Sequence, residues 1–322
     1  MRWIILAWIW VTAWSAEAAT FQETFVANPF ADGWAVYGNS NLFAWDPINQ
    51  RLAVTWDSSQ ANSYFYRPLG TILGENDDFS FAFDLQFSSI AVGVDPNKPA
   101  TFEVAVGFSC FQCATNPALE RGVGIDPVNG ACNLAEFDYF PDSGYGATIS
   151  PTIISSNNQF ASSFTFPLTM DPGALFHIAM SYTASNQTLV TTMTRNGQVF
   201  GPIKKTVLGT SFTNFHLDEF AICSYSDTGA DGSILAQGTV ANITIVTPPP
   251  PVNNLCGSVV DGVWLVQFMS NTNWVYTLSR STDLGAWNDV CEPTPGNGTT
   301  LFLQDTNNIC AKAFYRVKAE RP

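Results

Sequence analysis

Residues 79–87 read Phe-Ser-Phe-Ala-Phe-Asp-Leu-Gln-Phe, and this stretch decides the fold because apolar and polar side chains alternate strictly along it. Successive side chains of a β-strand point to opposite faces of its sheet, so the apolar ones here share one face. The same alternation occurs in residues 52–56, 102–108 and 176–182. The 3.6-residue period of an amphipathic helix is not found between residues 20 and 247. The main body is therefore predicted to be an all-β sandwich.

Turn-forming residues separate these predicted strands. The clearest turn is Arg195-Asn196-Gly197-Gln198, because Asn and Gly both tolerate the positive φ of a two-residue hairpin turn. Residues 74–78 and 95–97 are also rich in Asn, Asp, Gly or Pro. Many short strands joined by such turns are typical of a sandwich.

The composition excludes two classes of partner. Of the 322 residues, 12% are charged and 46% are apolar, and the formal net charge is −14. Nucleic acids and anionic membrane surfaces bind basic patches, and the sequence has no basic run. We therefore expect neither as a partner, and we attribute the acidic balance to solubility outside the cell.

The first 19 residues have the pattern of a signal peptide. Arg2 precedes an apolar run over residues 3–14, and Ala16-Glu17-Ala18 is a small-x-small cleavage site. We expect a secreted, periplasmic or cell-surface protein, with an uncleaved N-terminal anchor as the alternative. No later stretch approaches 18 apolar residues, so no membrane span is expected after cleavage.

Four consecutive prolines, residues 248–251, mark the predicted domain boundary, because such a run forms an extended and fairly stiff spacer. The prediction is a large domain over residues 20–247 and a small β domain over residues 252–322.

Three stretches together resemble the concanavalin A-like lectin/glucanase superfamily, which includes laminin-G-like and legume-type lectin domains. They are residues 133–140, residues 176–191 and residues 238–245. The resemblance implies that the large domain is a jelly roll, with residues 238–245 returning beside the N-terminal strand. Residues 264–317 are similar to small β modules at the C-termini of exported bacterial proteins, which implies a fibronectin-like sandwich.

Glu136 and Asp138 are the leading site candidates. Residues i and i+2 of a strand share a face, so both carboxylates are expected on one side, with Phe137 and Tyr139 in the core. In legume lectins the matching acids ligate metal ions, which implies a calcium site with Asp142, Ser143 or Asn157 supplying further oxygens. This sequence lacks the Asn, Asp and His that complete the legume pattern. The alternative is an exposed strand face on which both acids are solvated.

The same residues resemble the first two acids of the laminarinase-type glucanase patterns Glu-x-Asp-x-Glu and Glu-x-Asp-x-x-Glu. Retaining hydrolysis needs two carboxyl groups about 5 Å apart. The third acid of these patterns would fall at Phe140 or Pro141, which cannot donate a proton, so we expect no catalysis. His177 and His216 lack the spacing of a catalytic triad or a metal site.

Aromatic side chains near the N-terminus provide a second candidate surface. Trp34 and Trp45 lie among Gly and Asn residues, and exposed aromatic rings stack on the apolar faces of sugars. The alternative is that these rings belong to the core.

The leading hypothesis is a secreted, non-catalytic protein that binds a glycan or another extracellular polymer. The alternatives are a glycoside hydrolase with an atypical acid pair and a structural cell-envelope interaction protein.

Seven cysteines remain, and export makes disulfides the default expectation. The predicted bridges are Cys113, or Cys110, with Cys132 and Cys291 with Cys310. The Cys110-Phe111-Gln112-Cys113 spacing also resembles zinc and thioredoxin motifs, although no βαβ pattern surrounds it. An odd count leaves at least one thiol unpaired within the chain or shared between chains.

Overall fold

The computed structural model describes residues 18–124, 126, 128–307 and 312–321. The chain divides into two compact units, Thr20–Pro250 and a second one that includes Pro251–Pro322. The division falls inside the four-proline run. Each unit is described by itself below. Across the described residues, no helix is long and apolar enough to cross a membrane.

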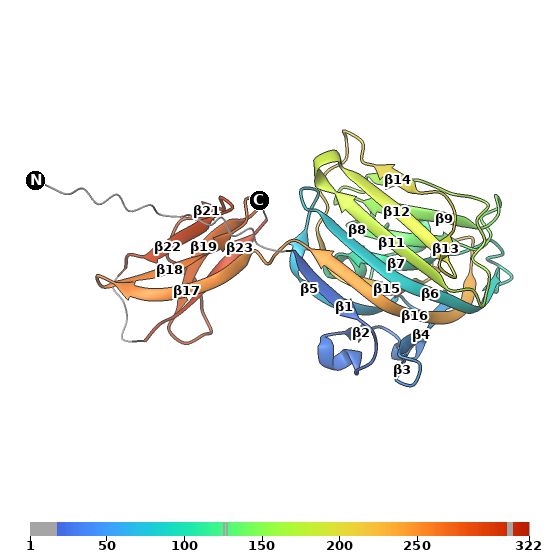
Figure 1. The fold of residues 1–322 in the computed structure, drawn as a ribbon, viewed down its shortest axis with the longest axis horizontal. Coiled ribbons are helices and arrows are strands. Elements are labelled where there is room, and N and C mark those ends of the chain that lie inside the picture. Colours follow the sequence, from blue (N-terminus) through green and yellow to red (C-terminus); the bar gives the residue numbers. More distant parts are fainter. Residues whose placement is uncertain (1–17, 125, 127, 308–311, 322) are drawn as a thin grey trace, which may run out of the picture. The chain divides into compact units, whose positions relative to one another are not determined.

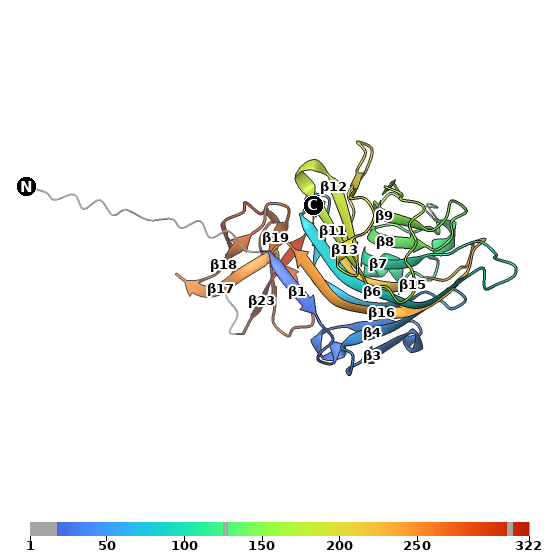
Figure 2. The ribbon, with the colours of Figure 1, turned by 45° about the vertical axis from the view of Figure 1, so that its right-hand side comes forward.

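The large unit is a jelly-roll sandwich of two antiparallel sheets (Figure 1). Sheet A has nine strands in the order β13-β12-β11-β6-β16-β4-β3, with β1 beside β16 and β14 beside β12. Sheet B has seven strands in the order β10-β9-β8-β7-β15-β5-β2. The turned view in Figure 2 shows the two layers facing each other. The closing strand β16 therefore lies beside the N-terminal strand, as the resemblance implied.

The bounds of these elements are as follows. Sheet A contains β1 Ala19–Glu23, β3 Phe43–Asp46, β4 Arg51–Asp57, β6 Phe79–Val92, β11 Phe176–Thr183, β12 Thr188–Arg195, β13 Gln198–Val199, β14 Lys204–Val207 and β16 Ile234–Thr247. Sheet B contains β2 Ala35–Tyr37, β5 Ser63–Leu73, β7 Val104–Ser109, β8 Leu134–Phe140, β9 Thr148–Ile154, β10 Phe160–Ser162 and β15 Leu217–Ser224. The short helices are η1 Pro29–Asp32, η2 Ser40–Leu42, α1 Phe111–Ala114, η3 Arg121–Val123 and η4 Ala184–Asn186.

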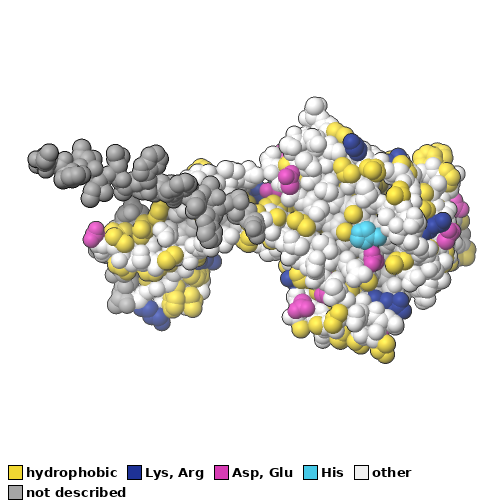
Figure 3. Space-filling view, in the orientation of Figure 1, with side chains coloured by type: hydrophobic (Ala, Val, Ile, Leu, Met, Phe, Trp, Pro, Cys, Tyr) yellow, Lys and Arg dark blue, Asp and Glu magenta, His cyan; other side chains and the backbone are white. Residues whose placement is uncertain are grey.

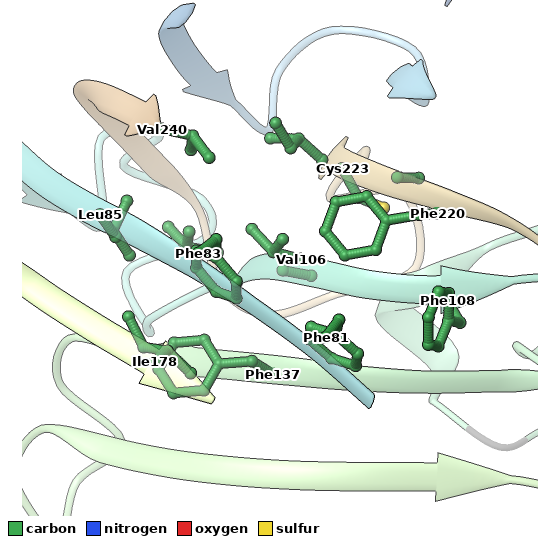
Figure 4. Packing of buried hydrophobic residues seen from close by; sticks show 14 of the residues in the cluster. Phe81, Phe83, Leu85, Val106, Phe108, Phe137, Ile178, Phe220, Cys223 and Val240 are labelled. Atoms are coloured by element: carbon green, nitrogen blue, oxygen red, sulfur yellow. The ribbon is translucent and has the colours of Figure 1, made fainter. Parts of the chain in front are cut away.

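The core lies between the sheets, and the alternation along residues 79–87 builds one side of it. In β6 the apolar residues at positions 79, 81, 83, 85 and 87 are all buried, as predicted. Figure 4 shows three of them, Phe81, Phe83 and Leu85, meeting Val106 and Phe137 from sheet B. The ring centroids of Phe83 and Phe137 lie 5.9 Å apart at a steep angle, which is a favourable aromatic arrangement.

The predicted hairpin turn is present at the end of β12. Arg195 pairs with Gln198, and Asn196 and Gly197 have φ of 49° and 78°. Both values lie in the left-handed region that this turn requires. The preceding strands β11 and β12 pair along their whole length from Phe176 to Thr183, which confirms the predicted hairpin.

The small unit is also all-β, with antiparallel sheets of three and four strands. The first sheet has the order β17-β18-β22, and in the second β20, β21 and β23 all pair with β19. The bounds are β17 Val252–Val260, β18 Val263–Ser270, β19 Val275–Ser281, β20 Asn288–Asp289, β21 Thr294–Pro295, β22 Thr300–Asp305 and β23 Phe314–Glu320. The prediction that this small unit is a fibronectin-like sandwich stays a prediction.

Candidate ligand-binding site

The outward face of sheet B carries the two acids singled out in the sequence. In β8, Phe137 and Tyr139 enter the core, and Glu136 and Asp138 point to the opposite face, as the alternation predicted. These two acids are not solvated, because their exposed fractions are 0% and 1%. The alternative of an exposed acidic strand is therefore wrong.

The β7–β8 connection, residues 110–133, covers this face. Tyr64 of β5 donates a hydrogen bond from its hydroxyl to the carbonyl of Ala114 at 2.9 Å. The amide of Asn62 donates to the carbonyl of Leu119 at 3.0 Å. The aromatic ring of Phe111 lies 4.8 Å from that of Tyr66, centroid to centroid. The connection is thereby held across the sheet from β8 toward β5.

Arg121 of η3 is the cation that this connection brings to the acids. Its Nε lies 3.0 Å from Oε1 of Glu103, and its Nη2 lies 3.6 Å from Oε2 of Glu136 and 3.6 Å from Oδ2 of Asp138. The Tyr225 hydroxyl donates a hydrogen bond to Oε1 of Glu136. We call Glu103, Arg121, Glu136, Asp138 and Tyr225 the buried acid cluster, because each is at most 8% exposed.

Small residues on β7 make room for this cluster. Ala105 pairs with Asp138, Gly107 with Glu136 and Ser109 with Leu134. A Cβ added at Gly107 would lie 2.3 Å from the carbonyl oxygen of Ala135, which is closer than real Cβ contacts. A glycine at this position therefore lets β7 and β8 pair closely beneath Arg121.

Burial dominates the protonation of the cluster. Removal from water raises the pKa of Glu103 to about 8, although the nearby Arg121 opposes this shift. Burial and the neighbouring Asp138 raise the pKa of Glu136 well above its ordinary range. Burial also raises the pKa of Asp138, against the attraction of Arg121. Three carboxyl groups share one guanidinium, so the cluster retains protons at neutral pH.

A cavity of about 180 Å³ opens beside the cluster. We call it the Tyr225 pocket. Its buried lining includes Ser109, Leu134 and Tyr225, and Ser109 donates a hydrogen bond at 2.7 Å to Glu219 of β15. Its more exposed lining includes Cys113, Asn116, Leu119, Asn129, Cys132 and Asn158. Burial raises the pKa of Glu219 to about 7. The pocket combines amides, hydroxyls and apolar groups.

The arrangement of the acids does not fit glycoside hydrolysis or calcium. Hydrolysis needs two carboxyl groups that face the substrate, but Glu136 and Asp138 face Arg121 and are closed off from solvent. Asp142 is exposed in the turn after β8, apart from the buried pair. Within the described residues, no three His, Cys, Asp or Glu side chains are grouped to hold a metal. A guanidinium beside both carboxylates also opposes a second cation there.

The structure separates the two tryptophans from these acids. Trp34 is 3% exposed and stacks on Phe65 with ring centroids 4.8 Å apart, so its ring is covered and belongs to the core. Trp45 lies on β3 of sheet A, is half-buried, and donates from its ring nitrogen to the carbonyl of Phe25 at 2.9 Å. A shared Trp34, Trp45, Glu136 and Asp138 site is therefore not assembled.

Among the cysteines that the structure describes, none forms a disulfide. Cys113 and Cys132 lie close together, since Nδ2 of Asn133 is 3.5 Å from the Cys113 sulfur and 4.0 Å from the Cys132 sulfur. Cys291 accepts a hydrogen bond from the backbone of Leu278 at 3.2 Å. Its predicted partner Cys310 lies outside the described residues, so that bridge stays a prediction.

Sequence reasoning missed Glu103, Arg121, Glu219 and Tyr225. Glu103 and Glu219 lie at or beside predicted strands, and nothing in their spacing relates them to residues 136–138. Arg121 lies in a segment without periodicity. The one available signal was its charge, because the chain has 13 Lys and Arg against 27 Asp and Glu.

Comparisons with known proteins bear on the fold. No protein-family model matches the sequence, and no curated protein matches it. Among solved structures, peanut lectin with a bound nonapeptide is similar, at 13% identity and a TM-score of 0.46, over 72% of this chain and 98% of that one. Lectin I from Ulex europaeus, in complex with the methyl glycoside of α-L-fucose, has 10% identity and a TM-score of 0.43, over 72% and 98%. The exoplasmic domain of VIP36, bound to Ca²⁺ and Man3GlcNAc, has 9% identity and a TM-score of 0.38, over 66% and 82%. Scores and identities this low do not assign the chain to a family.

Proposed function

We propose that the protein is a non-catalytic binding protein whose large unit holds a glycan in the Tyr225 pocket. The observation that carries this proposal is an accessible polar pocket beside acids that are closed to solvent. An accessible pocket lets a ligand bind, whereas the buried cluster gives that ligand no carboxyl pair to react with.

The chemistry of the pocket suits a neutral, polyhydroxylated ligand. The side-chain amides of Asn116, Asn129 and Asn158 both donate and accept hydrogen bonds, as sugar hydroxyls do. Leu119 offers apolar surface to the C–H groups of a sugar ring. Pockets with apolar walls and a few directed polar groups are typical of small-molecule sites.

The test is a glycan array followed by calorimetry with the best neutral oligosaccharide, with and without a chelator of divalent cations. We expect Asn129→Ala to weaken binding at least about fivefold, which corresponds to about 1 kcal/mol for one lost hydrogen bond. Gln198→Ala removes an exposed amide from β13 of sheet A and should leave the affinity unchanged. We expect the chelator to have no effect, since the acids already face Arg121. An array without hits at millimolar ligand, or equal losses in the two variants, contradicts the proposal.

A structural cell-envelope interaction protein is the second candidate, and the covered outward face of sheet B favours it. This candidate expects the chain to co-sediment with cell envelopes even when the glycan array gives no hits. Protein that stays in the supernatant in that experiment would contradict this second candidate function.

We also propose that the chain is exported, as the pattern of residues 1–19 suggests. These residues lie largely outside the described part of the structure. N-terminal sequencing of the protein recovered from its producing cell should begin at Ala19 or Thr20. A chain that retains Met1 contradicts cleavage.

A further inference from the structure

Three cysteines gather where the β7–β8 connection begins and ends. Cys110 precedes α1, Cys113 lies within it, and Cys132 stands just before β8. All three side chains are half-buried, so they are neither sealed in the core nor fully solvated. Cys113 and Cys132 also line the Tyr225 pocket, which gives a small molecule a route to both sulfurs.

Cys113 is the centre of this thiol cluster. Its thiol lies within hydrogen-bonding reach of the thiols of Cys110 and Cys132. Its sulfur also accepts from Nδ2 of Asn133 at 3.5 Å, and the same nitrogen lies 4.0 Å from the Cys132 sulfur. Asn133 is itself fixed, since its Oδ1 accepts the backbone N–H of His216 at 3.0 Å. Three donors thus converge on one sulfur atom.

The hydrogen bonds within this cluster shift the pKa values of the three thiols in different directions. The hydrogen bonds from Cys110, Cys132 and Asn133 hold the pKa of the Cys113 thiol well below its usual range. Donating to Cys113 raises the pKa of Cys110 and of Cys132. Hydrogen bonds from its neighbours therefore favour the thiolate of Cys113, which is the nucleophilic form.

We propose that Cys113 is a thiol–disulfide exchange site, at which a small-molecule disulfide entering through the Tyr225 pocket oxidises Cys113 and Cys132 to a bridge. This proposal goes beyond the glycan proposal and requires no ligand in the pocket.

The exchange balances in two steps. The Cys113 thiolate attacks one sulfur of the small disulfide, forms a mixed disulfide, and releases the other half as a thiolate. Cys132 then loses its proton to that thiolate and attacks the Cys113 sulfur, which releases the second half. In total, the Cys113 thiolate and the Cys132 thiol lose two electrons, and the small disulfide becomes one thiol and one thiolate.

Cys110 is the alternative resolving thiol. It also donates to Cys113, so it can attack the same sulfur when Cys132 is missing. The wild-type product is the Cys113–Cys132 bridge, because this pair lines the pocket through which the disulfide enters.

The test treats the fully reduced full-length protein with oxidised glutathione at pH 7, quenches the reaction with an alkylating agent, and maps the peptides by mass spectrometry. We expect Cys113 to react at least about tenfold faster than Cys256, because its thiolate is stabilised. Cys256 is the matched control within the same chain, since its side chain is exposed and therefore more accessible. The end product should contain the Cys113–Cys132 bridge.

Variants separate the roles of the thiols. Cys132→Ser should retain the fast first step, accumulate the mixed disulfide, and then form a Cys110–Cys113 bridge more slowly. Cys113→Ser should leave Cys110 and Cys132 reduced at the same glutathione concentration. Unchanged melting temperatures of the reduced variants would show that they fold. The proposal is overturned if Cys256 reacts as fast as Cys113 in the wild-type chain. It is also overturned if the thiols of Cys110 and Cys132 are oxidised in Cys113→Ser at the rate seen in the wild-type chain.

Discussion

The outward faces of the two sheets in the large unit differ in what covers them. On sheet A, His177 of β11 pairs with Asp84 of β6 at 2.7 Å, and its side chain is 48% exposed. Figure 3 shows the large unit from one side, where a histidine lies beside an acidic group and most of the surface is uncharged. On sheet B, the β7–β8 connection covers Glu136 and Asp138 completely. Strand alternation sends polar residues outward on both sheets, and segments outside the strands, such as the β7–β8 connection and Tyr225, decide whether water reaches them.

This difference changes the energetics of the same residue types. In the pair on sheet A, the His177 side chain is 48% exposed and the Asp84 side chain 16%, so solvent screens their interaction and its contribution to stability is small. Charges under the connection have lost their hydration and depend on one another. Substitutions on the two faces therefore test the comparison directly.

The largest effect is expected from Arg121→Met, which keeps volume but removes the cation from three buried acids. The free energy of unfolding of the large unit should fall by about 3–5 kcal/mol at pH 8, measured by urea denaturation. Arg195→Met is the control, because Arg195 pairs with Asp171 at 3.0 Å on the surface. It should cost less than about 1 kcal/mol. Equal losses would show that the cluster is not the buried network described.

The next effect is a loss of stability as the pH rises. The raised pKa of Glu103, about 8 against an ordinary 4.5, means that the folded state binds more protons than the unfolded one between these values. The contribution of Glu103 to the free energy of unfolding should therefore be fully present near pH 4.5 and be lost as the pH rises through about 8. One pKa unit corresponds to about 1.4 kcal/mol, so the shift of Glu103 from 4.5 to about 8 corresponds to a total loss of up to about 5 kcal/mol.

Glu103→Gln should reduce the slope of this profile, measured as the unfolding free energy between pH 5 and 9, and the raised pKa values of Glu136, Asp138 and Glu219 should account for the slope that remains. Asp231→Asn changes an exposed carboxylate and should leave the profile unchanged. A stability that rises with pH over this range would contradict the buried, proton-retaining cluster.

A smaller effect is expected from Tyr225→Phe. The variant loses the hydrogen bond donated to Oε1 of Glu136 and leaves that buried oxygen without its donor. The expected cost is about 1–3 kcal/mol by urea denaturation. Tyr145→Phe is the matched control, since Tyr145 is 74% exposed. If both variants cost the same, the Tyr225 hydroxyl does not stabilise the cluster.

The smallest effect is expected on sheet A. Asp84→Asn removes the charge that pairs with His177 and accepts a hydrogen bond from Asn242 at 2.7 Å. Because these groups are partly solvated, the cost should stay below about 1 kcal/mol. A loss as large as that of Arg121→Met would erase the distinction between the two faces.

The sandwich was predictable because local rules govern it. Alternation along residues 79–87 assigned the buried face of β6, and Asn196-Gly197 assigned a turn that few other dipeptides form. The common face of Glu136 and Asp138 followed from the same period of two. The solvent exposure of that face did not follow, because it depends on a separate segment of chain.

The remaining contacts of the site could not be predicted from the sequence, because they join residues that lie far apart along the chain. The Tyr225 and Glu136 side chains meet across 89 positions of sequence. Arg121 reaches the acids from a connection whose path is determined by contacts such as that of Tyr64 with Ala114. Neither periodicity nor residue spacing carries such information. Trp34 was ambiguous for the same reason, since its stacking on Phe65 depends on how η1 packs against the sheets.

The adjacency of β1 and β16 has a mechanical consequence. These strands are the first and last of the large unit, and they pair with each other in sheet A. Tension applied between the two chain ends of this unit would therefore pass directly through the backbone contacts between these strands. Sheet B and the Tyr225 pocket lie off that force path. A pull on the ends would load one pair of strands and leave the pocket unstrained.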